Sequence, residues 1–114
     1  MPRRDDSVLI RDMLDAAKEA VSFAQGKQRG DLDKDRKLVL AVVRLVEIIG
    51  EAGGRVSKEF QKGHPDIPWP AITGMRNRLV HAYFDVDLDR VWDTVQDDLP
   101  LLISKLEKIA GKDS

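Results

Sequence analysis

The sequence predicts an all-α protein, an up-and-down bundle of four to five helices in a single domain that spans residues 1–114. Apolar residues recur at three- and four-residue intervals along most of the chain, and we find no alternating pattern that predicts a strand. With 42% hydrophobic and 34% charged residues, the composition is that of a globular domain rather than a disordered chain.

The first helix is expected to begin at Asp6 or Ser7, because either side chain can cap it, and to end at Gly26. Its apolar face is formed by Ile10, Met13, Leu14, Ala17 and Val21. The polar stretch that follows, residues 27–33, is expected to be a loop.

The second helix is expected to run from near Asp35 to about Ala52, where Gly53 and Gly54 relax it. Its apolar stripe comprises Leu38, Ala41, Val42, Leu45 and Ile49, widened by Val39, Val43 and Val46. A stripe this wide predicts contact on two sides, with the core on one and another subunit on the other. A short helical continuation over residues 55–62 is expected next, capped by Ser57.

The third helix is expected to follow a loop over residues 63–68, with Pro70 in its first turn. It is expected to end near residues 81–83, which places Asn77 and His81 on one helical face.

The C-terminal part of the sequence predicts two further helices. After a turn at residues 85–87, Asp87 is expected to cap a fourth helix that carries Leu88, Val91, Trp92 and Val95. Pro100 is expected to start the fifth helix.

Charge and cysteine content limit the possible functions. The net charge is −1, with 19 basic and 20 acidic residues, which argues against wholesale coating of nucleic acid but allows a local basic cleft. The absence of cysteine excludes disulfides and thiolate catalysis. We find neither a signal peptide nor a membrane-spanning stretch. We therefore expect no membrane association and a cytoplasmic location.

Basic and acidic residues are segregated along the chain. The cations between residues 55 and 81 are Arg55, Lys58, Lys62, Arg76 and Arg78, against two acidic residues. Between residues 85 and 98 there are six aspartates and one arginine. This segregation fits either an ordinary solvated surface or an anion site next to a surface for a basic partner.

The most informative segment, residues 76–83, combines a cation, an amide, an imidazole and a phenol. The guanidinium of Arg76 suits phosphate, and the imidazole of His81 can move a proton near neutral pH. A neutral His81 can take the proton of an RNA 2′-hydroxyl, after which the alkoxide attacks the adjacent phosphorus and Arg76 stabilises the added charge. Asn77 can orient the imidazole or a phosphate oxygen. This route needs no metal or other cofactor, and it requires RNA rather than DNA.

The same route also needs an acid for the leaving 5′-oxygen. His64, in a loop before Pro65, is a poor second histidine. In a two-fold homodimer, two copies of His81 can face each other across a shared cleft.

Each candidate residue also has a purely structural interpretation. An arginine and a histidine at this spacing are common by chance in a helical protein. Tyr83 can be a packing residue with a solvated hydroxyl, and Trp69 and Trp92 are expected to be core or interface residues rather than base-stacking platforms. The acidic pair Glu47 and Glu51 fits either a polar face or a support for the arginines.

The extended pattern of residues 76–83, followed by Val86 and Asp87, resembles the signature of HepT-like proteins, a branch of the HEPN superfamily. Residues 43–52, 67–69 and 87–93 resemble other recurring segments of that family, and the resemblance covers most of the chain from Lys37 onward.

The resemblance implies a HEPN-like, homodimeric helical bundle that acts as a metal-independent ribonuclease toxin in a type VII toxin–antitoxin pair. The family's catalytic arginine and histidine correspond to Arg76 and His81, and its polar residue corresponds to Asn77. Arg78 is an added cation that can strengthen phosphate binding. The implied partner is a minimal nucleotidyltransferase antitoxin of the MNT type, which can transfer AMP to the tyrosine that corresponds to Tyr83.

Two functions of different classes therefore follow. The first is a homodimeric toxin that cleaves RNA through Arg76 and His81. The second is a non-catalytic helical subunit that binds nucleotide or substrate in a nucleotidyltransferase complex. Arg76, Asn77 and His81 together favour the first, and the near-neutral net charge favours the second. A bundle in which the motif is only structural ranks last.

Overall fold

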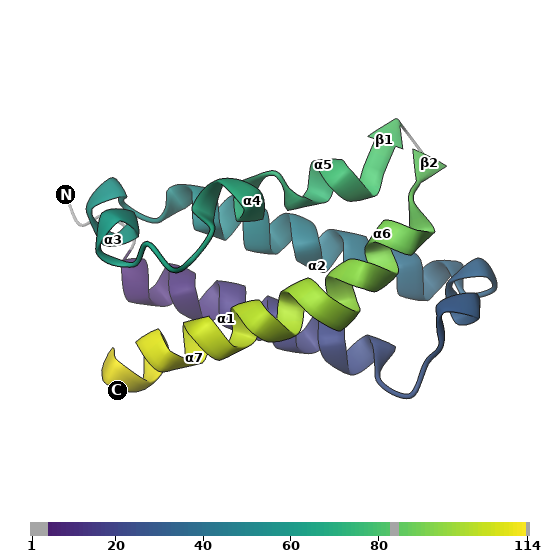
Figure 1. Ribbon diagram of the computed structural model, residues 1–114, viewed down its shortest axis with the longest axis horizontal. Coiled ribbons are helices and arrows are strands. Elements are labelled where there is room, and N and C mark those ends of the chain that lie inside the picture. The colour runs from purple at the N-terminus through teal and green to yellow at the C-terminus, as the bar shows by residue number, and fades with distance from the viewer. Residues whose placement is uncertain (1–4, 83–84, 114) are drawn as a thin grey trace.

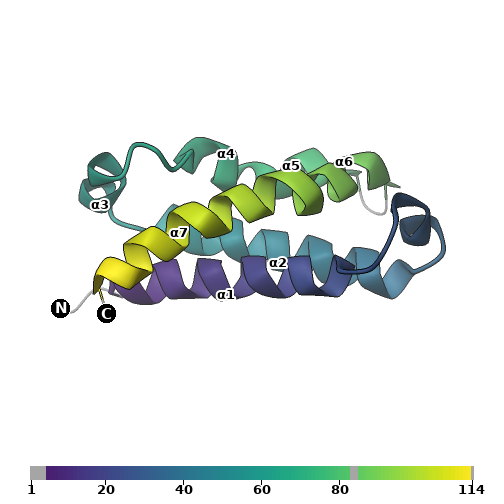
Figure 2. The ribbon, with the colours of Figure 1, turned by 60° about the horizontal axis from the view of Figure 1, so that its bottom comes forward.

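A computed structural model describes residues 5–82 and 85–113, and over these residues the chain is the predicted all-α bundle (Figure 1). Helices α1 (Asp6–Ala24) and α2 (Arg36–Arg55) lie antiparallel and side by side. Helix α7 (Leu99–Asp113) packs across α1 (Figure 2). The 3-10 helix η1 (Arg29–Asp33) occupies most of the stretch that the sequence predicts to be a loop.

The start of the bundle is fixed by side chains that cap helices. Asp5, rather than Asp6 or Ser7, caps α1 by accepting from the backbone N–H of Ser7. The Asp6 carboxylate instead accepts from the backbone N–H of Ser57 at 3.0 Å and from its hydroxyl at 2.7 Å. Ser57 caps α3 (Lys58–Gly63), as predicted, by accepting from the backbone N–H of Phe60.

Helix α2 continues through the glycine pair to Arg55, so the prediction that these glycines relax it is wrong. Glycines on α2 instead allow a close approach to α4 (Trp69–Thr73). A Cβ at Gly50 would lie 3.2 Å from the carbonyl oxygen of Ile72, and one at Gly53 would lie 3.1 Å from its Cγ2. This contact sets the position of the segment that follows α4.

The predicted third helix is two short helices, α4 and α5 (Met75–Leu79), which meet at Gly74. It ends at Leu79, and the chain then forms an antiparallel hairpin of β1 (Val80–Ala82) and β2 (Asp85–Val86). The predicted helix end near residues 81–83 is therefore wrong, as is the absence of strands. Strands of three and two residues are too short to show alternation, which explains why the sequence did not predict them.

Helices α6 (Leu88–Asp93) and α7 are joined without a break by the π-helical segment η2 (Thr94–Asp98), so Pro100 does not start a separate helix. In a regular α-helix the proline ring would clash with the carbonyl four residues earlier, and the wider turn of η2 directly before it relieves that conflict. Asp87 caps α6, as predicted, by accepting from the backbone N–H of Arg90.

The core lies between α1, α2 and the α6–α7 helix, and it takes up most of the wide apolar stripe of α2. The buried residues of that stripe are Leu38, Val39, Val42, Leu45, Val46 and Ile49. Ala41 and Val43 are half-buried, and Leu40 beside them is exposed. Most of the stripe is thus covered within one chain, and the second contact, a homodimer, stays a prediction.

The two tryptophans agree with the expectation that they are core residues. Trp69 is buried, and its indole N–H donates to the carbonyl of His64 at 3.1 Å. Trp92 is half-buried against the core. In the described part of the chain, none of the helices has the length and apolar character needed to cross a membrane.

Candidate functional site

The candidate site lies where α5 passes into the hairpin. The cation of Arg76 projects from α5, and His81 stands in β1 between Val80 and Ala82. Val80 pairs with Val86 and Ala82 with Asp85, so the pairing shifts register across His81. Irregularities of this kind redirect a side chain, and the His81 side chain is 55% exposed.

Asn77 and His81 do not share a helical face, because the helix ends at Leu79 before it reaches His81. This expectation was therefore wrong. Among the described residues, no hydrogen bond or ion pair joins Arg76, Asn77 and His81 to one another. Each of the two candidate catalytic side chains instead faces a carboxylate from another element.

Arg76 faces α2. Its Nε lies 3.6 Å from Oε2 of Glu47, and this nitrogen is buried without a hydrogen-bond partner in the described part of the chain. The side chain as a whole is 42% exposed, so other parts of it reach solvent. Oε1 of Glu47 accepts from Nη1 of Arg44 at 2.7 Å, and Nη1 of Arg44 also lies 3.6 Å from Glu51. The sequence-based alternative that Glu47 and Glu51 support arginines agrees with this arrangement.

His81 faces the start of α6. Its Nε2 lies 3.7 Å from Oδ2 of Asp87, which is close enough for an ion pair when the imidazole is protonated. The pKa of Asp87 is lowered, chiefly because its carboxylate accepts from the backbone N–H of Arg90. Desolvation opposes this effect, and the nearby His81 adds to it. A carboxylate held ionised beside an imidazole stabilises the imidazolium that forms when His81 takes a proton.

The two remaining polar residues of the motif are exposed. Nη2 of Arg78 donates to the carbonyl oxygen of Ala71 at 2.7 Å, which ties α5 to α4. Asn77 is exposed at the surface of α5. Tyr83 lies outside the described residues.

His64 is engaged in local structure. Its ring stacks on Phe60 with the ring centres 4.2 Å apart, and its Nδ1 lies 3.0 Å from the carbonyl oxygen of the same residue. These contacts agree with the expectation that His64 is a poor second histidine for catalysis.

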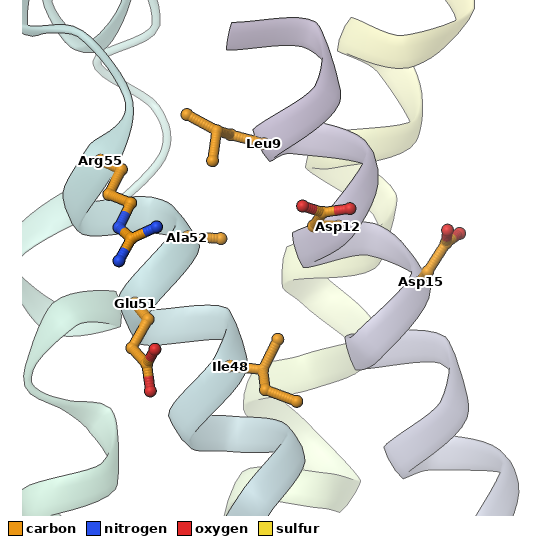
Figure 3. A pocket seen from close by; sticks show the side chains of 7 residues that line it. All are labelled: Leu9, Asp12, Asp15, Ile48, Glu51, Ala52 and Arg55. Carbon is orange, nitrogen blue, oxygen red and sulfur yellow. The ribbon is translucent and has the colours of Figure 1, made fainter. Parts of the chain in front are cut away.

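A groove of about 310 Å³ lies between α1 and α2, and none of its lining residues belongs to the motif (Figure 3). Leu9, Ile48 and Ala52 form apolar walls, and Asp12, Asp15 and Glu51 add carboxylates beside the single cation Arg55. This excess of negative charge disfavours phosphate, so the groove does not suit an RNA backbone. Among the side chains that the structure describes, no three His, Asp or Glu residues gather as a metal site.

The sequence did not predict the pairing of His81 with Asp87. It indicated only that Asp87 caps a helix. The two residues are six positions apart, and the hairpin that brings them together has no pattern to reveal it. The spacing of Glu47 and Glu51 was visible, but the approach of Arg76 to Glu47 depends on how closely α4 packs on α2.

Comparisons with known proteins identify the family of the chain. The family model described as "Ribonuclease HepT-like" matches residues 13–109. A Thermococcus cleftensis protein named "Probable ribonuclease HepT" is 40% identical over 107 residues, covering 94% of this chain and 97% of the relative. A Methanocaldococcus jannaschii protein named "Putative RNase MJ1216" is 33% identical over 117 residues, covering 99% and 97%.

A third relative, the Caldanaerobacter subterraneus protein named "Putative RNase TTE0752", is 35% identical over 104 residues, covering 91% of this chain and 93% of its own. No solved structure gives a significant match. The family model and the relatives both extend over most of the sequence, and the chain therefore belongs to the HepT-like ribonuclease family.

Proposed function

We propose that this chain is the toxin of a type VII toxin–antitoxin pair and acts as a metal-independent endoribonuclease. The observation that carries the proposal is the exposed His81 beside Asp87 on the hairpin that directly follows Arg76, in a member of a ribonuclease family. Proton transfer and phosphate stabilisation, the two requirements of the reaction, are thereby assigned to one short segment.

The reaction is a transesterification in which the 2′-oxygen displaces the 5′-oxygen from phosphorus. His81 takes the proton of the 2′-hydroxyl, the 2′-oxygen bonds to phosphorus, and the bond from phosphorus to the 5′-oxygen breaks. Arg76 stabilises the negative charge on the phosphorane oxygens. An acid protonates the departing 5′-oxygen, so the products carry a 2′,3′-cyclic phosphate and a 5′-hydroxyl.

The acid is assigned to His81 of a second copy, in a cleft shared by two protomers. Support for this assignment is chemical: His64, the other histidine, is engaged with Phe60, and a two-fold axis would bring two copies of His81 together. The partly exposed side of α2 that carries Leu40 and Val43 is available for contact with a second copy.

Inhibition is proposed to come from an MNT-type nucleotidyltransferase antitoxin that transfers AMP from ATP to the hydroxyl of Tyr83, with release of pyrophosphate. Tyr83 is two residues from His81 in the sequence. An adenylate there would add bulk and a negative charge that compete with an RNA phosphate for Arg76.

The test is cleavage of defined RNAs in EDTA by wild type, Arg76→Ala and His81→Ala, each first shown to be folded and of the same assembly state. Cleavage by wild type alone, with cyclic-phosphate and 5′-hydroxyl ends, is the expected result. If freshly purified, unmodified wild type leaves every RNA intact, the non-catalytic nucleotide-binding subunit replaces the ribonuclease as the better proposal.

A further inference from the structure

We propose that Glu47 is a positioning residue that holds the guanidinium of Arg76 in the orientation in which it binds the reacting phosphate. This inference rests on the proposed function, because it assigns a second residue to the same site. It gives α2 a part in catalysis in addition to its part in the core.

The first observation is the state of Arg76. Its Nε is buried, has no hydrogen-bond partner among the described residues, and lies 3.6 Å from Oε2 of Glu47. A buried N–H without a hydrogen bond is costly, and a nearby negative charge reduces that cost. The separation is only slightly longer than a hydrogen bond, so a small movement of either side chain would form one.

The second observation is that the terminal nitrogens of Arg76 donate to none of the described residues. The contact of Glu47 with the guanidinium is through the inner nitrogen, Nε. The outer nitrogens, which carry the paired donors that suit a phosphate, are therefore left for an anion. This is the arrangement expected of a carboxylate that orients an arginine without occupying its binding edge.

The third observation is that Glu47 is itself held in place. Its other oxygen, Oε1, accepts from Nη1 of Arg44 at 2.7 Å. The Glu47 side chain is 36% exposed, so solvent screens its charge only in part. Glu47 thus lies between two cations, Arg44 on α2 and Arg76 on α5.

Glu47 can influence cleavage in two ways that have opposite signs. If it orients Arg76, its removal lets the guanidinium move, and a misplaced catalytic group lowers kcat. If it only neutralises Arg76, its removal leaves a stronger cation, which would tighten RNA binding and speed cleavage. The isosteric substitution Glu47→Gln separates the two, because it removes the charge and keeps the volume.

The kinetic experiment compares wild type with Glu47→Gln, Glu47→Asp and the control Glu51→Gln. The control removes a carboxylate one turn further along α2, which lies near Arg44 but is not paired with Arg76. We expect Glu47→Gln to lower kcat by about 10- to 100-fold with little change in KM. Glu47→Asp should recover part of the loss, and Glu51→Gln should cleave like wild type.

A second measurement follows the Nε–H of Arg76 directly by nitrogen-15 NMR, with the resonance assigned by its loss in Arg76→Lys. We expect a slowly exchanging signal in wild type and Glu51→Gln, and a shifted, faster-exchanging signal in Glu47→Gln. This readout does not need RNA, so it still decides the geometry if wild type proves not to be a ribonuclease.

Three results would overturn the inference. One is a Glu47→Gln variant that cleaves as fast as wild type or faster, and another is an Arg76 signal that is unchanged in that variant. The third is a loss of cleavage equal in Glu47→Gln and Glu51→Gln, which would indicate a general effect on α2. Thermal melting of all three variants distinguishes loss of position from loss of folding.

Discussion

The carboxylate of Asp87 lies 3.7 Å from Nε2 of His81 through one oxygen and caps α6 through the other. His81, the proposed base, is thereby paired with the residue that starts α6, although it lies in an exposed and irregular strand. The capping bond fixes the carboxylate, and the fixed carboxylate in turn limits the orientations of the imidazole.

The two functions of Asp87 can be separated by substitution. Asparagine is as good a helix cap as aspartate but carries no charge, so Asp87→Asn should fold normally and cleave RNA about tenfold more slowly. That loss should be smaller than the roughly 10²- to 10⁴-fold cost of removing proton transfer in His81→Ala. Asp87→Ala should also lower the melting temperature. Wild-type cleavage rates in Asp87→Asn would show that the charge does not assist His81.

The lowered pKa of Asp87 predicts how stability depends on pH. A carboxyl whose pKa is lower in the folded state stabilises the protein while it is ionised. This contribution is complete above the ordinary pKa of 3.8 and is lost as the pH falls through the lower folded value. Urea midpoints of wild type and Asp87→Asn should therefore differ most near neutral pH and converge in acid. A difference between the two urea midpoints that grows as the pH falls would contradict the predicted direction.

The packing of α4 on α2 predicts opposite effects for two glycines on the same helix. A Cβ at Gly50 would lie 3.2 Å from a backbone carbonyl of α4, so Gly50→Ala should destabilise the protein by about 1–3 kcal/mol. At Gly54 the nearest atom is Cγ2 of Thr73 at 3.6 Å, an ordinary contact. Gly54→Ala should therefore stabilise by about 0.4–1 kcal/mol through reduced freedom of the unfolded chain. Chemical denaturation of both variants measures the difference.

The sequence predicted the fold class because the long helices have strong apolar periodicity and clear caps. Ser57 and Asp87 were correctly assigned as caps, since capping depends on residues within one turn. The errors occur where tertiary contacts decide the structure. The hairpin after Leu79 is too short to show an alternating sequence pattern. The π-helical segment that precedes Pro100 and lets the helix continue through it has no known sequence signature.

The candidate site was predicted only in part, for a similar reason. Arg76 and His81 could be named from residue chemistry and family resemblance. Their carboxylate partners depend on contacts between elements, namely α5 with α2 and the hairpin with α6. Glu47 is 29 positions from Arg76 in the sequence, and periodicity contains no information about such a pairing.

Substitution of Arg78 tests phosphate binding separately from the catalytic step. Its guanidinium is exposed and uses one nitrogen to hold the carbonyl of Ala71. We expect Arg78→Gln to raise KM and to reduce the salt dependence of RNA binding by about one counterion, with kcat little changed. The matched control is Lys108→Gln, which removes an exposed cation from α7. Equal effects of both variants would assign the change to net charge alone.

The proposed shared cleft predicts how activity responds to mixed dimers. If two copies of His81 act together, one as base and one as acid, a dimer with one wild-type and one His81→Ala protomer cannot complete the reaction. When the two proteins are mixed and allowed to exchange subunits, activity should then fall with the square of the wild-type fraction.

Independent sites would instead give activity in direct proportion to the wild-type fraction, because each wild-type protomer would work alone. A cross-linked or tandem-fused heterodimer removes the need for subunit exchange and gives the same answer from one species. A fused heterodimer with half the activity of the fused wild type would therefore place base and acid within one protomer, and the acid would have to be sought among side chains other than a second His81.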